Sequence, residues 1–158
     1  MLIINGYMKK KKIPFMMIAD SAAPALLLAY GIARIGCHLA GLTDGTHGNP
    51  SSLPWAIDFG DGIPRHPVNL YEVIFLFGLA FFMVQKEKSV AYLRGVPHSL
   101  PNGLRFKIFM VGYLLWRFFV EFIKPVWVLP MGLSVIQLAT IAGMFYYVGR
   151  NSFRPKIM

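Results

Sequence analysis

Four long apolar stretches divide the chain, and shorter polar segments separate them. The stretches cover residues 13–33, 68–84, 108–123 and 126–148. An α-helix rises about 1.5 Å per residue and a hydrocarbon core is ~30 Å thick, so each stretch is long enough, or nearly so, to cross a bilayer. The pattern predicts an all-α integral membrane protein with four transmembrane helices in one domain, residues 1–158.

The composition agrees with a membrane protein. Apolar residues make up 56% of the 158 residues, which is more than most soluble domains contain. The single cysteine, Cys37, cannot form an internal disulfide, and no Cys/His cluster has the spacing of a zinc site. A disulfide scaffold and a zinc module are therefore excluded, and we expect neither a metal nor an organic cofactor.

The basic residues predict the orientation. Lys and Arg number 16 against 7 Asp and Glu, a net charge of +9 that nucleic-acid binders share. When the four spans alternate, twelve of these 16 residues fall on one side of the membrane, and only Arg65 and Lys124 fall on the other. Both termini are then cytoplasmic, and the polar loop 43–65, which we expect to be irregular, lies outside. No basic surface remains for nucleic acid.

Charged side chains inside or at the end of the predicted spans are candidate functional residues, because each costs a few kcal/mol to insert. They are Asp20, Arg34, Glu72, Arg117 and Glu121. Arg117 and Glu121 are spaced i, i+4 on one helix face, so they could simply neutralise each other. An arginine that precedes its acid has the less favourable order, so its guanidinium could equally bind another anion. The sequence leaves both interpretations open.

The topology brings the two arginines to a similar depth near the outer face, where the loop 43–65 could complete a polar pocket. The planar guanidinium fork suits a lipid phosphate, because it donates two parallel hydrogen bonds and stays charged. His66 stands at the start of the second span and His38 follows Cys37. Each histidine is open to a structural or a catalytic interpretation.

These residues lie in segments that resemble one family, the bacterial prolipoprotein diacylglyceryl transferases. The matching segments, in order, are KKKKIPFMMIADSAAPAL, ARIGCHLAGLTDG, LPWAIDF, PRHPVNLYE, YLLWRFFVEF and MGLSVIQLATIAG. In the arginine-centred signature, Arg34, Gly36, Gly41 and Gly45 match. The chain departs from this signature at three positions, where the family has Asn, Asn and Glu: Cys37, Ala40 and Leu42.

The resemblance implies a multi-pass enzyme of the bacterial cytoplasmic (inner) membrane. Such an enzyme transfers the diacylglyceryl group of phosphatidylglycerol to the lipobox cysteine thiol of prolipoproteins within the lipid bilayer. By motif position, Arg34 and Arg117 match the phosphate-handling arginines. With the candidates above, the expected catalytic residues are Arg34, Arg117, Glu121 and His66. The expected substrate-binding residues are His38, Gly45, Arg65, Tyr71, Glu72 and Gln137.

The resemblance covers the last four of the seven spans usual in the family, and it lacks the His-Gly-Gly segment that carries an essential histidine. We therefore expect a fragment, a short natural form, or half of a split enzyme whose partner chain supplies the N-terminal spans. The alternative function is a non-catalytic membrane protein that binds phospholipid or assists assembly.

Overall fold

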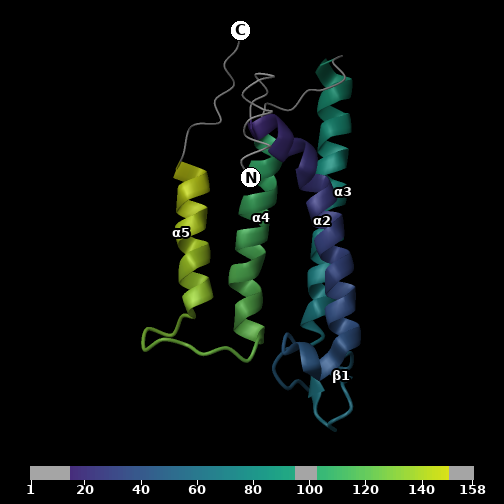
Figure 1. The fold of residues 1–158 in the computed structure, drawn as a ribbon, viewed down its shortest axis with the longest axis vertical. Coiled ribbons are helices and arrows are strands. Elements are labelled where there is room, and N and C mark those ends of the chain that lie inside the picture. Colours follow the sequence, from purple (N-terminus) through teal and green to yellow (C-terminus); the bar gives the residue numbers. More distant parts are fainter. Residues whose placement is uncertain (1–14, 95–102, 150–158) are drawn as a thin grey trace, which may run out of the picture.

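The computed structural model describes residues 15–94 and 103–149, and helices account for most of them (Figure 1). The long helices of these ranges are α2 (Phe15–Ala40), α3 (Val68–Arg94), α4 (Leu104–Val120) and α5 (Val135–Gly149). They run up and down side by side, and the short 3-10 turns η1 (Gly41–Asp44) and η2 (Glu121–Ile123) extend α2 and α4. The connections 41–67 and 121–134 consequently lie at the same end of the bundle.

The architecture supports an all-α membrane protein, although the helix bounds differ from the predicted spans. By length and composition, two helical segments of the described residues could cross a membrane: Met17–Asp44 and Val68–Lys86. The predicted cytoplasmic termini, residues 1–14 and 150–158, lie outside the described residues.

The fourth predicted span was wrong at its start, because the helix begins at Val135 and not at residue 126. Pro125 and Pro130 interrupt the intervening segment, and Gly132 has a φ of 79°, a left-handed conformation that ends a helix. Apolar composition alone could not distinguish this irregular segment from a helix.

The loop between α2 and α3 is more regular than predicted. It contains an antiparallel hairpin of β1 (Ile57–Asp58) and β2 (Pro64–Arg65). One oxygen of Asp58, Oδ1, accepts hydrogen bonds from the backbone nitrogens of Gly60, Asp61 and Gly62, at 2.8, 3.1 and 3.0 Å. Outside this hairpin the loop is largely irregular, as expected, and a single carboxylate organises the hairpin turn.

A small-residue contact holds α2 against α3. The buried cluster between them contains Ala23, Leu27, Leu76, Ala80 and Met83. The two alanines let the backbones approach, as small residues do at helix interfaces within membranes. This contact fixes Arg34, in the second half of α2, relative to Glu72 at the start of α3.

Asp20, one of the charged residues in the predicted spans, caps a neighbouring helix. Its carboxylate is buried and accepts hydrogen bonds from the backbone nitrogens of Gly103 and Phe106, the latter at 2.8 Å. These nitrogens belong to the first turn of α4, whose own N-cap, Gly103, has no side chain to bind them. Asp20 supplies the cap from α2 and also brings negative charge to the positive end of the helix dipole.

We expect Asp20→Ala to lower the free energy of unfolding by about 1–2 kcal/mol, because two buried N–H groups lose their acceptor. Asp20→Asn should lose less, since its amide oxygen still accepts. Thermal unfolding followed by circular dichroism in detergent micelles measures the difference. Ser21→Ala, at the neighbouring exposed position, is the control, and an Asp20→Ala chain as stable as that control would contradict the capping role.

Candidate functional site

A buried carboxylate, that of Glu72, lies among three cations from three different segments. Glu72 is 1% exposed. Its Oε2 lies 2.7 Å from Nε of Arg34 on α2. Its Oε1 lies 3.5 Å from Nη1 of Arg117 on α4 and 3.7 Å from Nζ of Lys124, just after η2. Because a buried charge must be compensated, Glu72 holds these segments together at the loop end of the bundle.

Arg117 connects this carboxylate to a second one. Its Nη2 lies 3.5 Å from Oε2 of Glu121, so the i, i+4 pair offered by the sequence is present but is not isolated. Glu121 is also buried, and its Oε1 accepts a hydrogen bond from the Ser134 hydroxyl at 3.3 Å. Arg117 is therefore shared between two carboxylates from different segments.

The charged cluster of Arg34, Glu72, Arg117, Glu121 and Lys124 has an excess of one positive charge. The Arg117 ion pairs, at 3.5 Å, are longer than the 2.7–2.9 Å typical of aligned charge-assisted hydrogen bonds. Within the described part of the chain, Nη1 of Arg117 has no aligned hydrogen-bond acceptor. The cluster thus combines an uncompensated positive charge with incompletely used donors, which suits an anionic ligand.

Two tyrosines orient Arg34. Its Nη2 donates to the Tyr30 hydroxyl at 2.6 Å, and the Tyr113 hydroxyl donates to Tyr30 at 3.1 Å. The two rings also pack edge to face, with centroids 5.5 Å apart. Nη1 of Arg34 lies 3.7 Å from Cys37 Sγ, so this cysteine packs beside the guanidinium. Tyr30 and Cys37 therefore hold the Arg34 guanidinium group in place before any ligand binds.

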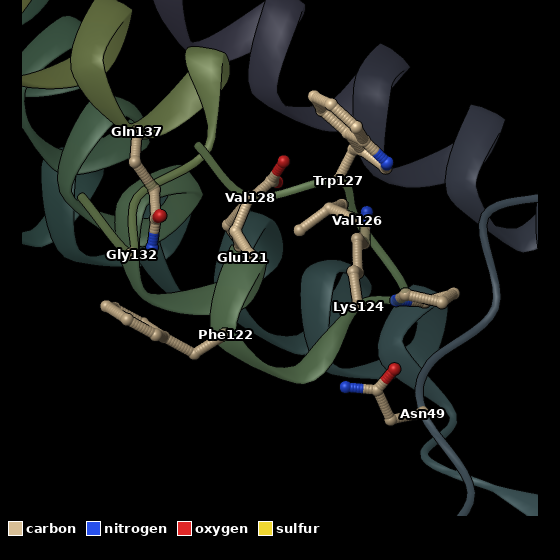
Figure 2. Close-up of a pocket in the computed structure, with 10 residues that line it drawn as sticks. Asn49, Glu121, Phe122, Lys124, Val126, Trp127, Val128, Gly132 and Gln137 are labelled. Atoms are coloured by element: carbon tan, nitrogen blue, oxygen red, sulfur yellow. The ribbon is translucent and has the colours of Figure 1, made fainter. Parts of the chain in front are cut away.

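A cavity of about 550 Å³ adjoins the charged cluster (Figure 2). Its polar wall contains Asn49, Glu121, Lys124 and Gln137, and its apolar wall contains Phe122, Val126, Trp127 and Val128. Figure 2 shows Lys124 and Asn49 on one side of the cavity and Gln137 on the other. A cavity lined by both charged and apolar side chains matches a ligand that joins an anionic group to a hydrocarbon part.

Gln137 was expected to bind substrate, but its side chain is committed to capping α5. Its Oε1 accepts from the Ser134 nitrogen at 2.8 Å, and its own backbone nitrogen donates to Ser134 Oγ at 3.1 Å. Its Nε2 donates to the Phe118 carbonyl oxygen at 3.4 Å. This is a capping box, and the Ser-x-x-Gln spacing was a sequence signal for it that we did not use.

Arg65 is held in the hairpin rather than in the cluster. Its two Nη atoms each lie 2.7 Å from an oxygen of Asp61. This guanidinium lowers the pKa of the Asp61 carboxyl to about 2. The pair joins neighbouring residues of an exposed turn, so Arg65 contributes to the shape of the loop.

The other expected residues lie around the cluster and not within it. The Tyr71 hydroxyl accepts from Trp55 Nε1 at 2.7 Å, and the His66 ring packs edge to face on Tyr71. The His38 ring packs similarly on Phe59. In residues 15–94 and 103–149, neither imidazole forms a hydrogen bond or ion pair with the charged cluster.

Gly45 has a backbone role at the end of η1. Its φ of 64° is left-handed, and its nitrogen donates to the Leu42 carbonyl oxygen at 3.1 Å. Glycine adopts this conformation without strain, so the residue reverses the chain after α2. No group of three or more His, Cys, Asp or Glu side chains that could hold a metal ion occurs among the described residues.

Sequence reasoning missed Lys124 and Tyr30. Lys124 was counted only as one of two basic residues on the outer side. A usable signal was present, because Arg117, Glu121 and Lys124 recur at spacings of four and three, which places them on one helix face. Tyr30 likewise precedes Arg34 by one helical turn.

The family comparison agrees with the motifs of the sequence. The family model for prolipoprotein diacylglyceryl transferase matches residues 1–149. The chain belongs to the prolipoprotein diacylglyceryl transferase family.

Curated relatives bear the name phosphatidylglycerol–prolipoprotein diacylglyceryl transferase. The Bordetella parapertussis protein is 30% identical over 92% of this chain and 56% of its own length. The Methylococcus capsulatus protein is 35% identical over the whole chain and 54% of its own length, and the Geobacter sulfurreducens protein is 34% identical over 87% and 46%. The chain thus spans about half the length of these relatives. No solved structure matches it significantly.

We expect Glu72→Gln to lower the free energy of unfolding by about 3–5 kcal/mol, because buried Lys124 and the two partly buried arginines would keep only Glu121 as a nearby carboxylate. Adding Lys124→Met should restore part of this loss, since it removes one of the repelling charges. Denaturant unfolding in micelles measures both variants, with Ser52→Ala in the exposed loop as the control. Equal stability of the Glu72→Gln chain and the control, without any effect of Lys124→Met, would mean that Glu72 does not organise the cluster.

Proposed function

We propose that this chain provides the phosphate-binding part of an enzyme that transfers the diacylglyceryl group of phosphatidylglycerol to the lipobox cysteine of prolipoproteins. The names of its relatives supply the reaction. The observation that carries the proposal is the charged cluster around Glu72, which has one excess positive charge and borders an amphipathic cavity.

The reaction requires stabilisation of a leaving phosphate. The cysteine sulfur forms a bond to the glyceryl carbon, the bond from that carbon to the phosphate oxygen breaks, and the electron pair leaves with glycerol phosphate. Arg34 and Arg117 are proposed to bind the phosphate oxygens and to stabilise the charge that develops there. Tyr30 and Glu72 position Arg34, while Glu72 and Glu121 position Arg117.

The thiol proton needs an acceptor. His66 is proposed for this role, since its ring packs on Tyr71, the residue directly before Glu72. The separation of both imidazoles from the charged cluster favours a second candidate function, in which the chain binds phospholipid without transferring it. The test below distinguishes the two functions.

The membrane placement is also a proposal. All four helices cross the bacterial cytoplasmic membrane, with both termini cytoplasmic and the two polar connections outside. The division of basic residues supports this orientation, and the connections 41–67 and 121–134 do lie at one end of the bundle (Figure 1). Large apolar side chains such as Ile74, Phe81 and Phe145 are mostly exposed on the helices, as expected of lipid-facing surfaces.

A partner chain that carries the N-terminal spans is proposed to complete the enzyme. Support comes from the relatives, which are about twice as long as the part that this chain matches. The described residues contain the charged cluster and its cavity, so the partner would act on a phosphate site that is already formed.

Cysteine labelling tests the orientation in a Cys37→Ser background. We expect a thiol at Ser52, in the exposed outer loop, to react with a membrane-impermeant reagent on intact spheroplasts. A thiol at Lys88, near the opposite end of α3, should react only after the membrane is permeabilised. The reverse pattern would contradict the topology and with it the outer location of the site.

The Arg117→Lys substitution tests the phosphate site. Lysine keeps the charge but loses the planar fork, so phosphatidylglycerol affinity should fall by a few-fold to tenfold, or ~0.6–1.4 kcal/mol. Lipid binding to the purified chain in micelles gives the affinity. Transfer is measured as the mass gain of a lipobox peptide, with and without the separately expressed N-terminal half of the Methylococcus capsulatus relative. We expect little transfer by the chain alone and restored transfer with that half.

The double variant Arg117→Leu with Glu121→Leu is the matched control, because it removes the i, i+4 pair without leaving a lone charge. Unchanged lipid affinity in this variant would show that Arg117 only neutralises Glu121. Phosphatidylglycerol binding that never leads to transfer, even with the N-terminal half present, would instead establish the second candidate function.

A further inference from the structure

The connection between η2 and α5 exposes an apolar surface at the loop end of the bundle. We call it the Trp127 surface, and it consists of Phe122, Trp127, Val128, Met131 and Val135, each more than half exposed. Trp127, at 89%, is more exposed than any other large hydrophobic side chain of the described residues. From residue 122 to residue 149 the only charged side chain is Lys124, and it is buried against Glu72.

The backbone beneath this surface is irregular, with few internal hydrogen bonds. Val126 donates to the Lys124 carbonyl oxygen at 2.9 Å, Gly132 donates to that of Leu129 at 2.8 Å, and Leu129 donates to that of Leu133 at 2.9 Å. A segment with so many other backbone groups to satisfy is unsuited to the hydrocarbon core. Its side chains, however, are unsuited to water, so the boundary between headgroups and acyl chains is the environment that satisfies both.

We propose that the Trp127 surface is a membrane anchor that lies in the headgroup–acyl boundary of the outer leaflet. Its occupant is the phospholipid bilayer itself, because the surface continues directly into exposed apolar residues of the adjoining helices, Phe119 on α4 and Ile136 on α5. It also carries no acidic side chain that would repel anionic lipid. This inference rests on the membrane location proposed above but not on the transfer reaction.

The anchor has a consequence for the cavity. Val126, Trp127 and Val128 form part of the cavity wall, next to the polar side chains of Lys124 and Glu121 (Figure 2). A segment anchored at the boundary holds this wall at the depth of the lipid phosphates. A phospholipid can then bring its headgroup to Lys124 without leaving its leaflet.

Tryptophan fluorescence of the full chain in phosphatidylglycerol/phosphatidylcholine vesicles tests the depth of Trp127. Trp55→Phe and Trp116→Phe leave Trp127 as the single emitter, and phenylalanine preserves the stacking of residue 116 on Phe75. Bromines placed near the carbonyl end of the lipid chains should quench the Trp127 fluorescence several-fold more than aqueous iodide does. They should also quench it more than bromines placed deep in the chains. Circular dichroism confirms that the helices persist.

Three results would overturn the inference. Trp127 fluorescence could be quenched by iodide alone, or it could be quenched most strongly by the deep bromines. It could also be protected from every quencher, which would indicate that a protein or a second copy covers the surface. A chain that sodium carbonate extracts from membranes would contradict the membrane location itself. If the single-tryptophan chain fails to fold, a nitroxide on Met131→Cys in a Cys37→Ser background gives the same depth. Ser52→Cys is then the water reference, and Ala142→Cys on α5 is the hydrocarbon reference.

Discussion

A carboxylate with almost no access to solvent must have its charge compensated by the protein, and the rest of this structure depends on how Glu72 meets that requirement. Arg34, Arg117 and Lys124 come from α2, α4 and the segment after η2, and each lies within 4 Å of this one side chain. The same attraction that brings the three cations together also leaves them with one charge in excess, after Glu121 is counted. The same ion pairs with Glu72 therefore assemble the bundle and form the anion site.

Two helix N-termini, at opposite ends of the bundle, are completed by side chains. Asp20 of α2 caps α4, and Ser134 with Gln137 caps α5 while the Ser134 hydroxyl also reaches Glu121. These bonds matter more inside a membrane than in water, because no solvent replaces a missing partner there. They also fix the segment 121–134, which contributes Lys124 to the charged cluster and the apolar wall to the cavity.

The apolar pattern was sufficient to predict a helical membrane protein. Four of the five charged residues expected in the spans do meet, namely Arg34, Glu72, Arg117 and Glu121, whereas Asp20 caps α4 instead. Helix ends were harder to predict, since the stretch 126–134 is as apolar as a helix but contains Pro130 and a left-handed Gly132. Arg34, Glu72 and Arg117, which the family motifs contain, lie together in the charged cluster. Gln137 and Arg65, which were also expected to bind substrate, instead form the capping box and the pair with Asp61. Lys124 was missed although its spacing from Arg117 and Glu121 places it on the same helix face, because its contact with Glu72 also depends on the path of the chain after α4.

The central claim is that the guanidinium groups of Arg34 and Arg117 contact a lipid phosphate while Glu72 holds them. Solid-state NMR in phosphatidylglycerol bilayers tests it directly, by measuring dipolar coupling between ¹⁵N in arginine side chains and ³¹P of the lipid. The account predicts a strongly coupled arginine signal that disappears in the Arg34→Lys, Arg117→Lys chain. A signal that persists unchanged in that chain, or that is absent in the parent, would contradict it.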